Sequence, residues 1–278
     1  MTGAVIARLP DGRLHLHHGP IDLILQTWGD PMATAEAERR ASARFGSILA
    51  ELVSELPLLR QEGGQPTGHV ARKMAAATRH FAPKFITPMA AVAGAVADAI
   101  CAEVAIDGIT RAYVNNGGDI ALHLAPGHSL TCAVAVGSDL PARVTVRAED
   151  AVRGIATSGW RGRSWSLGIA DSVTVLARTA AEADAAATMI ANAVDLPDHP
   201  GILRQPASDL QAESDLGARL VTVSVFGLTA EDIAQALDAG EMAAADFHQR
   251  GLIEAAALFL HPQTRTLGPL RLKEPAFD

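Results

Sequence analysis

The sequence predicts an α+β fold in which helices and strands are mixed without regular alternation. Short strand-like runs, bounded by Gly, Pro or Asp, gather between residues 111 and 177. Long stretches with helical spacing of apolar residues precede them, at residues 33–56 and 87–108. A doubly wound sheet would need strands and helices in strict turn, which this sequence lacks. Because 49% of the 278 residues are hydrophobic, the chain can bury a full core, and we expect residues 1–278 to form a single domain.

The chain begins with a predicted hairpin, followed by a third strand and an amphipathic helix. Asp11-Gly12 joins the first two strand-like runs, and this dipeptide suits a tight turn. The helix at residues 33–56 carries apolar side chains on one face and charges on the other. Glycines and prolines then interrupt the periodicity at residues 57–68, where we expect a flexible loop able to act as a lid. The three strand-like runs cover residues 3–9, 13–18 and 21–28.

Two capping signals fix the start of two further helices. Thr87-Pro88 places a capping residue before a proline at the first helical position, which predicts a helix to residues 107–108. Its apolar sequence is interrupted by Asp98 and Glu103, which favours a buried helix of a soluble protein over a membrane span. Thr179 and Glu182 fit a capping box for a helix over residues 180–193. Further helical segments are expected after the strand at residues 220–226 and extend to about residue 249. The other strands are expected at residues 111–115, 119–124, 130–136, 143–147, 172–177, 220–226, 252–260 and 266–272.

Composition and charge exclude several classes of partner. The net charge of −8 leaves no basic surplus for a phosphate backbone, so we expect no nucleic acid to bind. The first ten residues lack the features of a signal peptide, and we expect a cytoplasmic protein without a membrane partner. Cys101 and Cys132 form no CxxC pair and are expected to be reduced. The Ala-rich helices can pack within one chain or across a homodimer.

The first candidate site is the segment Asn115-Asn116-Gly117-Gly118-Asp119, which follows a strand. Paired glycines allow a tight turn and let a ligand approach the backbone amides, while the flanking Asn and Asp side chains supply donors and acceptors. The segment therefore suits the binding of a cofactor. A simple hairpin turn would use the same residues, and the local pattern leaves both interpretations open.

The second candidate is a segment of small residues beside two arginines, over residues 154–163. Thr157, Ser158 and Gly159 expose hydroxyl and backbone groups for cofactor binding, and Arg161 and Arg163 can clamp an anion. The alternative is an exposed loop with solvated arginines. A GxSxG elbow is absent, which disfavours Ser158 as the nucleophile of a hydrolase.

The third candidate is a metal site on the predicted helix at residues 180–193. Asp184 and Thr188 stand four residues apart and therefore share one face of that helix. A carboxylate and a hydroxyl suit a hard cation such as Mg²⁺, which takes its other ligands from water and phosphate. The alternative is a carboxylate hydrogen-bonded to a neighbouring loop.

These three segments, in this order, resemble the ApbE-like superfamily, whose best-known members are FAD:protein FMN transferases. That family shows a VNxGGD loop, an xTSG loop and an ADAxAT helix after a VTV strand, and the sequence here reads VNNGGD, ATSG and ADAAAT. The likeness covers most of residues 10–260 and is nearest to an uncharacterised cytoplasmic branch. It implies a T-fold-related architecture of two lobes, and it implies that Asp184 and Thr188 bind Mg²⁺ at the pyrophosphate of FAD.

The resemblance also covers the middle helix, where one departure bears on activity. Gly94 and Asp98 match the family pattern, and the match implies that Asp98 lies at the flavin nucleotide. The Asp, two glycines and Lys of the family are replaced here by Thr87, Met89, Ala90 and Ala93. Because the replacement of Lys removes a positive charge that would face phosphate, transfer of FMN does not follow from the resemblance.

The sequence therefore leaves three functions open. The first is a Mg²⁺-dependent enzyme that processes FAD, either by FMN transfer or by cleavage of the pyrophosphate. The second is a protein that binds FAD, FMN or another nucleotide without catalysis. The third is an enzyme for a different small anionic metabolite, with Arg161 and Arg163 as clamps.

Overall fold

The computed structural model mixes helices and strands as the sequence predicts, and the α+β class is confirmed. The structure describes residues 3–134, 142–270 and 272–273. Within these ranges, no helix combines the length and the apolar character needed to cross a membrane. The chain forms two compact units: unit 1 comprises residues 1–130, 146–156 and 178–184, and unit 2 comprises residues 131–145, 157–177 and 185–278.

Unit 1 is built on an antiparallel sheet with the strand order β1-β2-β3-β4-β5-β8. The predicted N-terminal hairpin is confirmed, since Val5 pairs with His17 and Gly12 adopts a φ of 87° in the turn. The leucines of β2 and β3 occupy alternate positions along each strand, and they are buried. The strands are β1 (Val5–Arg8), β2 (Leu14–His18), β3 (Ile21–Gly29), β4 (Ile109–Asn116), β5 (Asp119–Leu124) and β8 (Gly154–Ser158).

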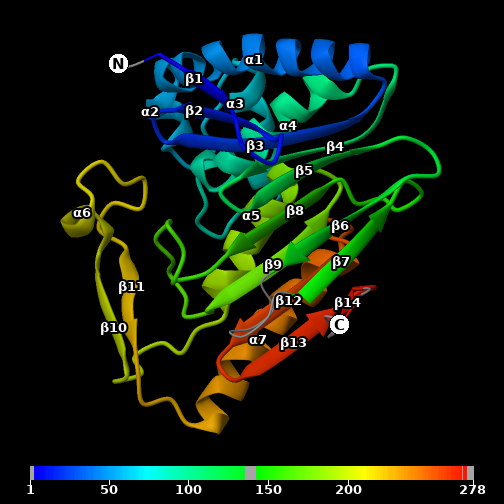
Figure 1. The fold of residues 1–278 in the computed structure, drawn as a ribbon. Helices are drawn as coiled ribbons and strands as arrows, with labels where there is room; N and C mark the ends of the chain where they lie inside the picture. Colours follow the sequence, from blue (N-terminus) through cyan, green and yellow to red (C-terminus); the bar gives the residue numbers. More distant parts are fainter. Residues whose placement is uncertain (1–2, 135–141, 271, 274–278) are drawn as a thin grey trace. The chain divides into compact units, whose positions relative to one another are not determined.

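The helices of unit 1 pack on this sheet. The long helix α1 lies along β2 and β3, and α4 packs against β4 and β5 (Figure 1). Most residues of α4 are buried, and its small Ala and Gly residues allow close approach of the neighbouring backbones. The helices are α1 (Pro31–Ser54), α2 (Leu56–Leu59), α3 (His69–Thr78), the 3₁₀ turns η1 (Arg79–Phe81) and η2 (Pro88–Ala91), α4 (Val92–Val104) and the first turn of α5 (Ala180–Ala193).

Two helix starts differ from the sequence-based expectation. Helix α1 begins at Pro31 because the Asp30 carboxylate accepts hydrogen bonds from the amides of Met32 and Ala33, at 2.8 and 3.1 Å. Thr87-Pro88 starts a 3₁₀ turn, and the α-helix itself begins only at Val92. Helix α3 was not predicted, since its short sequence follows the glycine-rich segment directly.

The predicted loop at residues 57–68 contains the short helix α2 and then runs to the start of α3. Its end is fixed by Glu55, whose carboxylate accepts hydrogen bonds from the Thr67 amide at 2.6 Å and the Gly68 amide at 2.9 Å. Both bonds lower the pKa of Glu55. The lid function and the single-domain organisation stay predictions.

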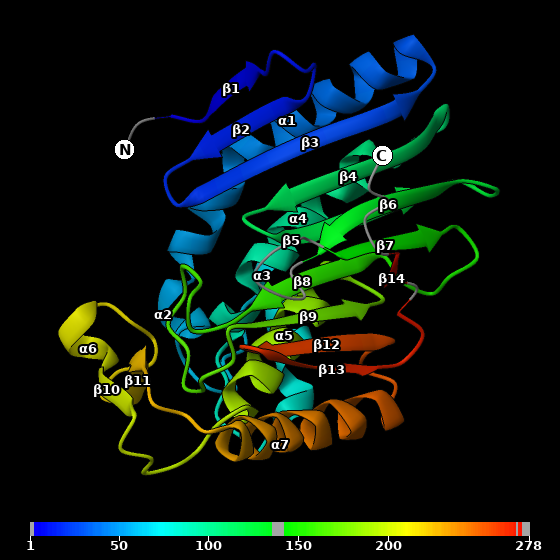
Figure 2. The ribbon, with the colours of Figure 1, turned by 60° about the horizontal axis from the view of Figure 1, so that its bottom comes forward.

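Unit 2 contains three sets of strands, with the orders β9-β12-β13, β10-β11 and β14-β7-β6. Helix α7 packs against β12 and β13 (Figure 2), and β12 is buried along its whole length. Residues 135–136 of the predicted run 130–136 lie outside the described residues. The strands are β6 (Ser129–Val134), β7 (Ala142–Arg147), β9 (Ser172–Ala177), β10 (Ile202–Pro206), β11 (Leu220–Val225), β12 (Ala255–Leu260), β13 (Gln263–Leu267) and β14 (Leu272–Lys273), and the further helices are α6 (Ala207–Leu210) and α7 (Ala230–Gln249).

Candidate functional site

The start of α4 is where several predicted site residues meet in unit 1. The Gly94 amide donates a hydrogen bond to Oδ2 of Asp184 at 3.0 Å, and the side-chain amide of Asn116 donates to the Ala93 carbonyl at 3.1 Å. Only glycine fits at position 94, because a Cβ there would lie 2.2 Å from the Ala180 carbonyl oxygen. The helix starts of α4 and α5 are therefore in direct backbone contact.

Each of these two helices caps the other with a carboxylate. Asp98 of α4 accepts hydrogen bonds from the amides of Ala180 and Ala181, both at 3.0 Å, at the start of α5. Asp184 of α5 accepts the amide of Gly94 in the first turn of α4. These amides have no partner within their own helix, so each carboxylate satisfies donors that would otherwise be left unpaired. The cofactor-binding role of Asp98 stays a prediction, and both of its oxygens already have backbone partners.

Thr179 completes the cap of α5. Its hydroxyl accepts the Glu182 amide at 3.1 Å, which confirms the hydroxyl half of the expected capping box. The Asp98 carboxylate accepts the two preceding amides, those of Ala180 and Ala181. Helix α5 covers Ala180–Ala193, as the sequence predicts.

The segment from Asn115 to Asp119 is a two-residue hairpin turn between β4 and β5. Asn116 pairs with Asp119, and Gly117 and Gly118 have φ values of 66° and 118°. The Asn115 side-chain oxygen accepts the Gly118 amide at 2.8 Å, which holds the turn closed. The hairpin interpretation is thus correct for the local structure, and cofactor binding by this segment stays a prediction.

The carboxylates of Asp119 and Asp184 repel one another at this position. Burial raises the pKa of Asp184 well above its ordinary value, the negative charge of Asp119 raises it further, and the amides of Gly94 and Ala93 lower it. Asp119 is buried, whereas Asp184 keeps part of its surface accessible to solvent. Among the described residues, the groups that act most on Asp184 include the two carboxylates Asp119 and Asp98 and no cation.

This charge pattern fits a hard divalent cation. A cation at Asp184 would favour the ionised form of both carboxylates, and the oxygen donors match the preference of Mg²⁺. Within the described ranges, no cluster of three or more His, Cys, Asp or Glu side chains could hold a metal by itself. A bound Mg²⁺ would therefore need hydroxyl, carbonyl, water or ligand oxygens in addition, and Thr188 lies one helical turn beyond Asp184 on α5.

The small-residue segment at residues 154–163 is only partly the loop that the sequence indicates. Residues 154–158 form β8, and Ile155 pairs with Ile120 of β5. In unit 2, the hydroxyls of Thr157 and Thr174 lie 2.9 Å apart. Gly159 is required by packing, because a Cβ there would lie 2.4 Å from the Asp171 carbonyl oxygen. Thr157, Ser158 and Gly159 stay candidates for cofactor binding.

The two predicted anion clamps of unit 2 differ in their surroundings. The Nε of Arg161 donates to Oδ1 of Asp171 at 2.6 Å, and its guanidinium lies over the Trp160 ring at 4.6 Å. Binding of an external anion by Arg161 would therefore compete with Asp171. Arg163 is exposed. The clamp function of both arginines stays a prediction.

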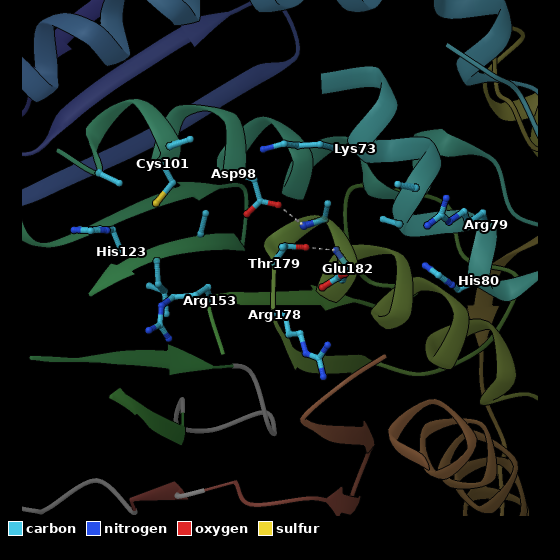
Figure 3. A pocket seen from close by; sticks show the side chains of 17 residues that line it. Lys73, Arg79, His80, Asp98, Cys101, His123, Arg153, Arg178, Thr179 and Glu182 are labelled. Carbon is cyan, nitrogen blue, oxygen red and sulfur yellow. Dashed lines mark hydrogen bonds between the residues drawn. The ribbon is translucent and has the colours of Figure 1, made fainter. Parts of the chain in front are cut away.

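A cavity of about 410 Å³ in unit 1 was not indicated by the sequence. It lies beside Asp98 and the start of α5 (Figure 3). Its basic lining residues come from separate segments of the chain: Lys73, Arg79, Arg153 and Arg178. A local motif cannot predict such a cavity, because its lining residues come from segments that are distant in the sequence.

Comparison with known proteins identifies the family. The model of the family described as "AbpE bacteria" matches residues 6–267. The chain belongs to this family. The resemblance to the ApbE-like superfamily that the three motifs indicate is thereby confirmed.

Relatives of this AbpE family member include archaeal proteins named UPF0280. One from Methanothermobacter thermautotrophicus is 33% identical over 185 residues, covering 66% of this chain and 65% of the relative. One from Methanopyrus kandleri is 36% identical over 145 residues, covering 51% of this chain and 55% of the relative. In both cases the match covers less than two thirds of the relative's own length.

A solved structure similar to this AbpE family member is that of the flavinyl transferase ApbE of Pseudomonas stutzeri in its apo form. The sequence identity is 11% and the TM-score is 0.42, over 96% of this chain and 95% of the other.

Proposed function

We propose that this chain binds Mg²⁺ at Asp184 and, through the cation, the phosphates of FAD or a related nucleotide. The observation that carries the proposal is the pair of carboxylates Asp119 and Asp184, because the negative charge of Asp119 adds to burial in raising the pKa of Asp184. Thr188 would add a hydroxyl ligand from the next turn of α5. Bound Mg²⁺ would supply charge neutralisation at the phosphate oxygens.

The hairpin turn beside these carboxylates suits the positioning of the nucleotide. Gly117 is exposed, and a Cβ built at Gly118 would meet no atom within 4 Å. The backbone of the turn is thus open to a ligand, and the positive φ values favour glycine at both positions. Asn116 and Asp119, at the two ends of the turn, tie it to the start of α4 and to the carboxylate pair.

Binding without transfer is the second candidate, and Ala93 is the observation that favours it. The resemblance implies a Lys at this position, whereas Ala93 offers only a methyl group and uses its carbonyl to accept Asn116. No cationic side chain from this position can therefore stabilise charge that develops on a phosphate.

The test of metal and nucleotide binding is isothermal titration of ligand-stripped protein with FAD, with and without Mg²⁺. We expect Mg²⁺ to tighten FAD binding, and we expect Asp184→Asn to remove the metal-dependent part. Asp209→Asn removes an exposed carboxylate elsewhere in the chain and serves as the matched control, with unchanged binding. Equal FAD affinity with and without Mg²⁺, or equal affinity in Asp184→Asn and Asp209→Asn, would refute the metal assignment.

A separate measurement distinguishes processing from binding. FAD is incubated with the wild-type protein and Mg²⁺, and the products are separated by chromatography. Release of AMP, or covalent capture of FMN, would show an enzyme of the FMN-transferase or pyrophosphatase type. Intact FAD together with tight binding would support a carrier. Failure to bind any flavin, with binding of a small anionic metabolite that Arg161 and Arg163 variants abolish, would support the third function.

A further inference from the structure

The cavity beside Asp98 gathers positive charge from segments that are far apart in the sequence. Lys73 comes from α3, Arg79 from η1, Arg153 from the residue before β8, and Arg178 from the residue before the cap of α5. Figure 3 shows these side chains around the start of α5, with Lys73 on the side of Asp98 and with Arg153 and Arg178 on the opposite side. All of them belong to unit 1.

Basic side chains outnumber acidic ones among the residues that line the cavity. Of the residues that line the cavity, four are Lys or Arg and two are acidic, Asp98 and Glu182, so the formal charge is four minus two, or +2, with His80 and His123 neutral. Asp98 accepts hydrogen bonds from two amides of α5. Burial raises the pKa of Asp98, and these amides and the charge of Lys73 offset only part of that rise. Within the described ranges, the side chains of Lys73 and Arg79 make no hydrogen bond or ion pair.

Arg153 is held in place by the backbone. Its guanidinium donates to the carbonyls of Ala148, Asp150 and Val152 at 2.7, 2.7 and 2.6 Å. Neutral carbonyls orient this group but do not cancel its charge. The cavity therefore contains the positioned cation Arg153 as well as the charge of Lys73.

The rest of the wall is made of small apolar side chains. Alanines of α3, α4, β5 and α5 line the cavity together with Leu122 and Cys101, and their small size is the reason that the space stays open. The volume of about 410 Å³ is larger than a bare inorganic anion needs and is in the range of small-molecule sites. Burial raises the pKa of the Cys101 thiol to about 12, so this side chain stays protonated and serves as an apolar part of the wall.

We propose that this cavity is a second binding site, separate from the metal site, for a small molecule with a doubly charged oxyanion head and a compact apolar body. Lys73, Arg79 and Arg178 contact the head, and the alanine-lined wall contacts the body. A phosphate monoester and a dicarboxylate share this chemistry. Binding requires neither Mg²⁺ nor Asp184.

The test uses three aromatic probes that differ in their charged groups: phenyl phosphate, phthalate and benzoate. Isothermal titration of the full chain in metal-free buffer is expected to show binding of at least one dianion with a Kd below about 1 mM. We expect benzoate, with one charge, to bind about tenfold more weakly or less. The stronger of the two dianions identifies the head group. Absence of binding by both dianions would overturn the proposal.

Variants locate the site. Lys73→Met and Arg178→Met are each expected to weaken binding of the stronger probe about ten- to a hundredfold. Arg72→Met is the matched control, because Arg72 neighbours Lys73 on α3 but lines a different cavity. Circular dichroism confirms that each variant is folded. Equal binding in Lys73→Met, Arg178→Met and Arg72→Met would overturn the assignment.

The result is distinguishable from that of the proposed metal site. Asp184→Asn is expected to bind phenyl phosphate or phthalate as the wild type does, even where it has lost Mg²⁺-dependent FAD binding. Loss of probe binding in Asp184→Asn would move the anion to the metal site and would contradict a second site.

Discussion

Replacing Gly94 by Ala should separate the starts of α4 and α5. The new Cβ would lie 2.2 Å from the Ala180 carbonyl oxygen and 2.7 Å from the Ala181 amide nitrogen. Ordinary contacts begin at 3.4 Å, so the two backbones would have to move apart by about 1.2 Å, the difference between 3.4 and 2.2 Å. Such a shift lengthens the bond between Gly94 and Asp184, which is 3.0 Å, beyond hydrogen-bonding distance.

The expected loss of stability follows from these changes. Overpacking costs about 1–3 kcal/mol, and the loss of a hydrogen bond to a carboxylate adds about 1.5–3 kcal/mol. The higher helix propensity of Ala offsets at most about 1 kcal/mol of this loss of stability. Gly94→Ala should therefore lower the free energy of unfolding by about 2–5 kcal/mol.

Gly46→Ala is the matched control for this prediction. Gly46 lies on the exposed side of α1, and a Cβ there would meet no atom within 4 Å. The same substitution should therefore stabilise the protein by about 0.5–1 kcal/mol. Urea unfolding of both variants, followed by far-ultraviolet circular dichroism, measures the two effects. If Gly94→Ala unfolds at the same urea concentration as Gly46→Ala, the close contact of α4 with α5 is not as described.

Two further predictions concern a titrating carboxylate and a helix cap. The pKa of Asp184 is raised in the folded state above its ordinary value of 3.8. The native protein therefore binds more protons than the unfolded chain as pH rises past 3.8, and metal-free stability should fall with rising pH. Thermal unfolding between about pH 5 and 8 should show a smaller fall for Asp184→Asn, and an equal fall in both proteins would refute this linkage. Thr229→Ala should destabilise the protein by about 0.5–2 kcal/mol, because the hydroxyl of Thr229 caps α7 by accepting the Asp232 amide. Thr229→Ser should keep most of that stability in the same urea assay.

Elements with local signals could be predicted from the sequence. Asp11-Gly12 located the first hairpin and Thr179 the start of α5, because turn and cap chemistry act within a few residues. Strand β8 was taken for a loop, since its small residues become a strand only by pairing with β5, at a separation of more than thirty residues in the chain. A local sequence pattern does not show which distant strand a segment pairs with.

For the candidate sites, too, the sequence indicated individual residues but not how the fold brings them together. The motif around Asn116 and the helix residue Asp184 were both singled out by sequence, yet their convergence on Ala93 and Gly94 required the structure. The charged cavity gave no signal at all, because Lys73 and Arg178 are more than a hundred residues apart. Charged residues that are distant in the sequence form a site only when the fold brings their side chains together, and local spacing in the sequence does not predict this.

Reciprocal capping offers a structural reason for residues that the family resemblance assigns to ligand binding. Gly94 and Asp98 are one turn apart on α4, and between them they contact Asp184 and the first amides of α5. That role alone explains a glycine and two carboxylates at these positions. Capping does not require a negative charge at position 184. A neutral Asn oxygen can also accept the Gly94 amide, and it would do so without repulsion from Asp119. Asp184→Asn therefore separates the two roles: a cap survives the change, and a metal ligand does not. A variant that folds as stably as the wild type but no longer responds to Mg²⁺ would mean that the negative charge at this position serves a cation, beyond its role in joining the helices.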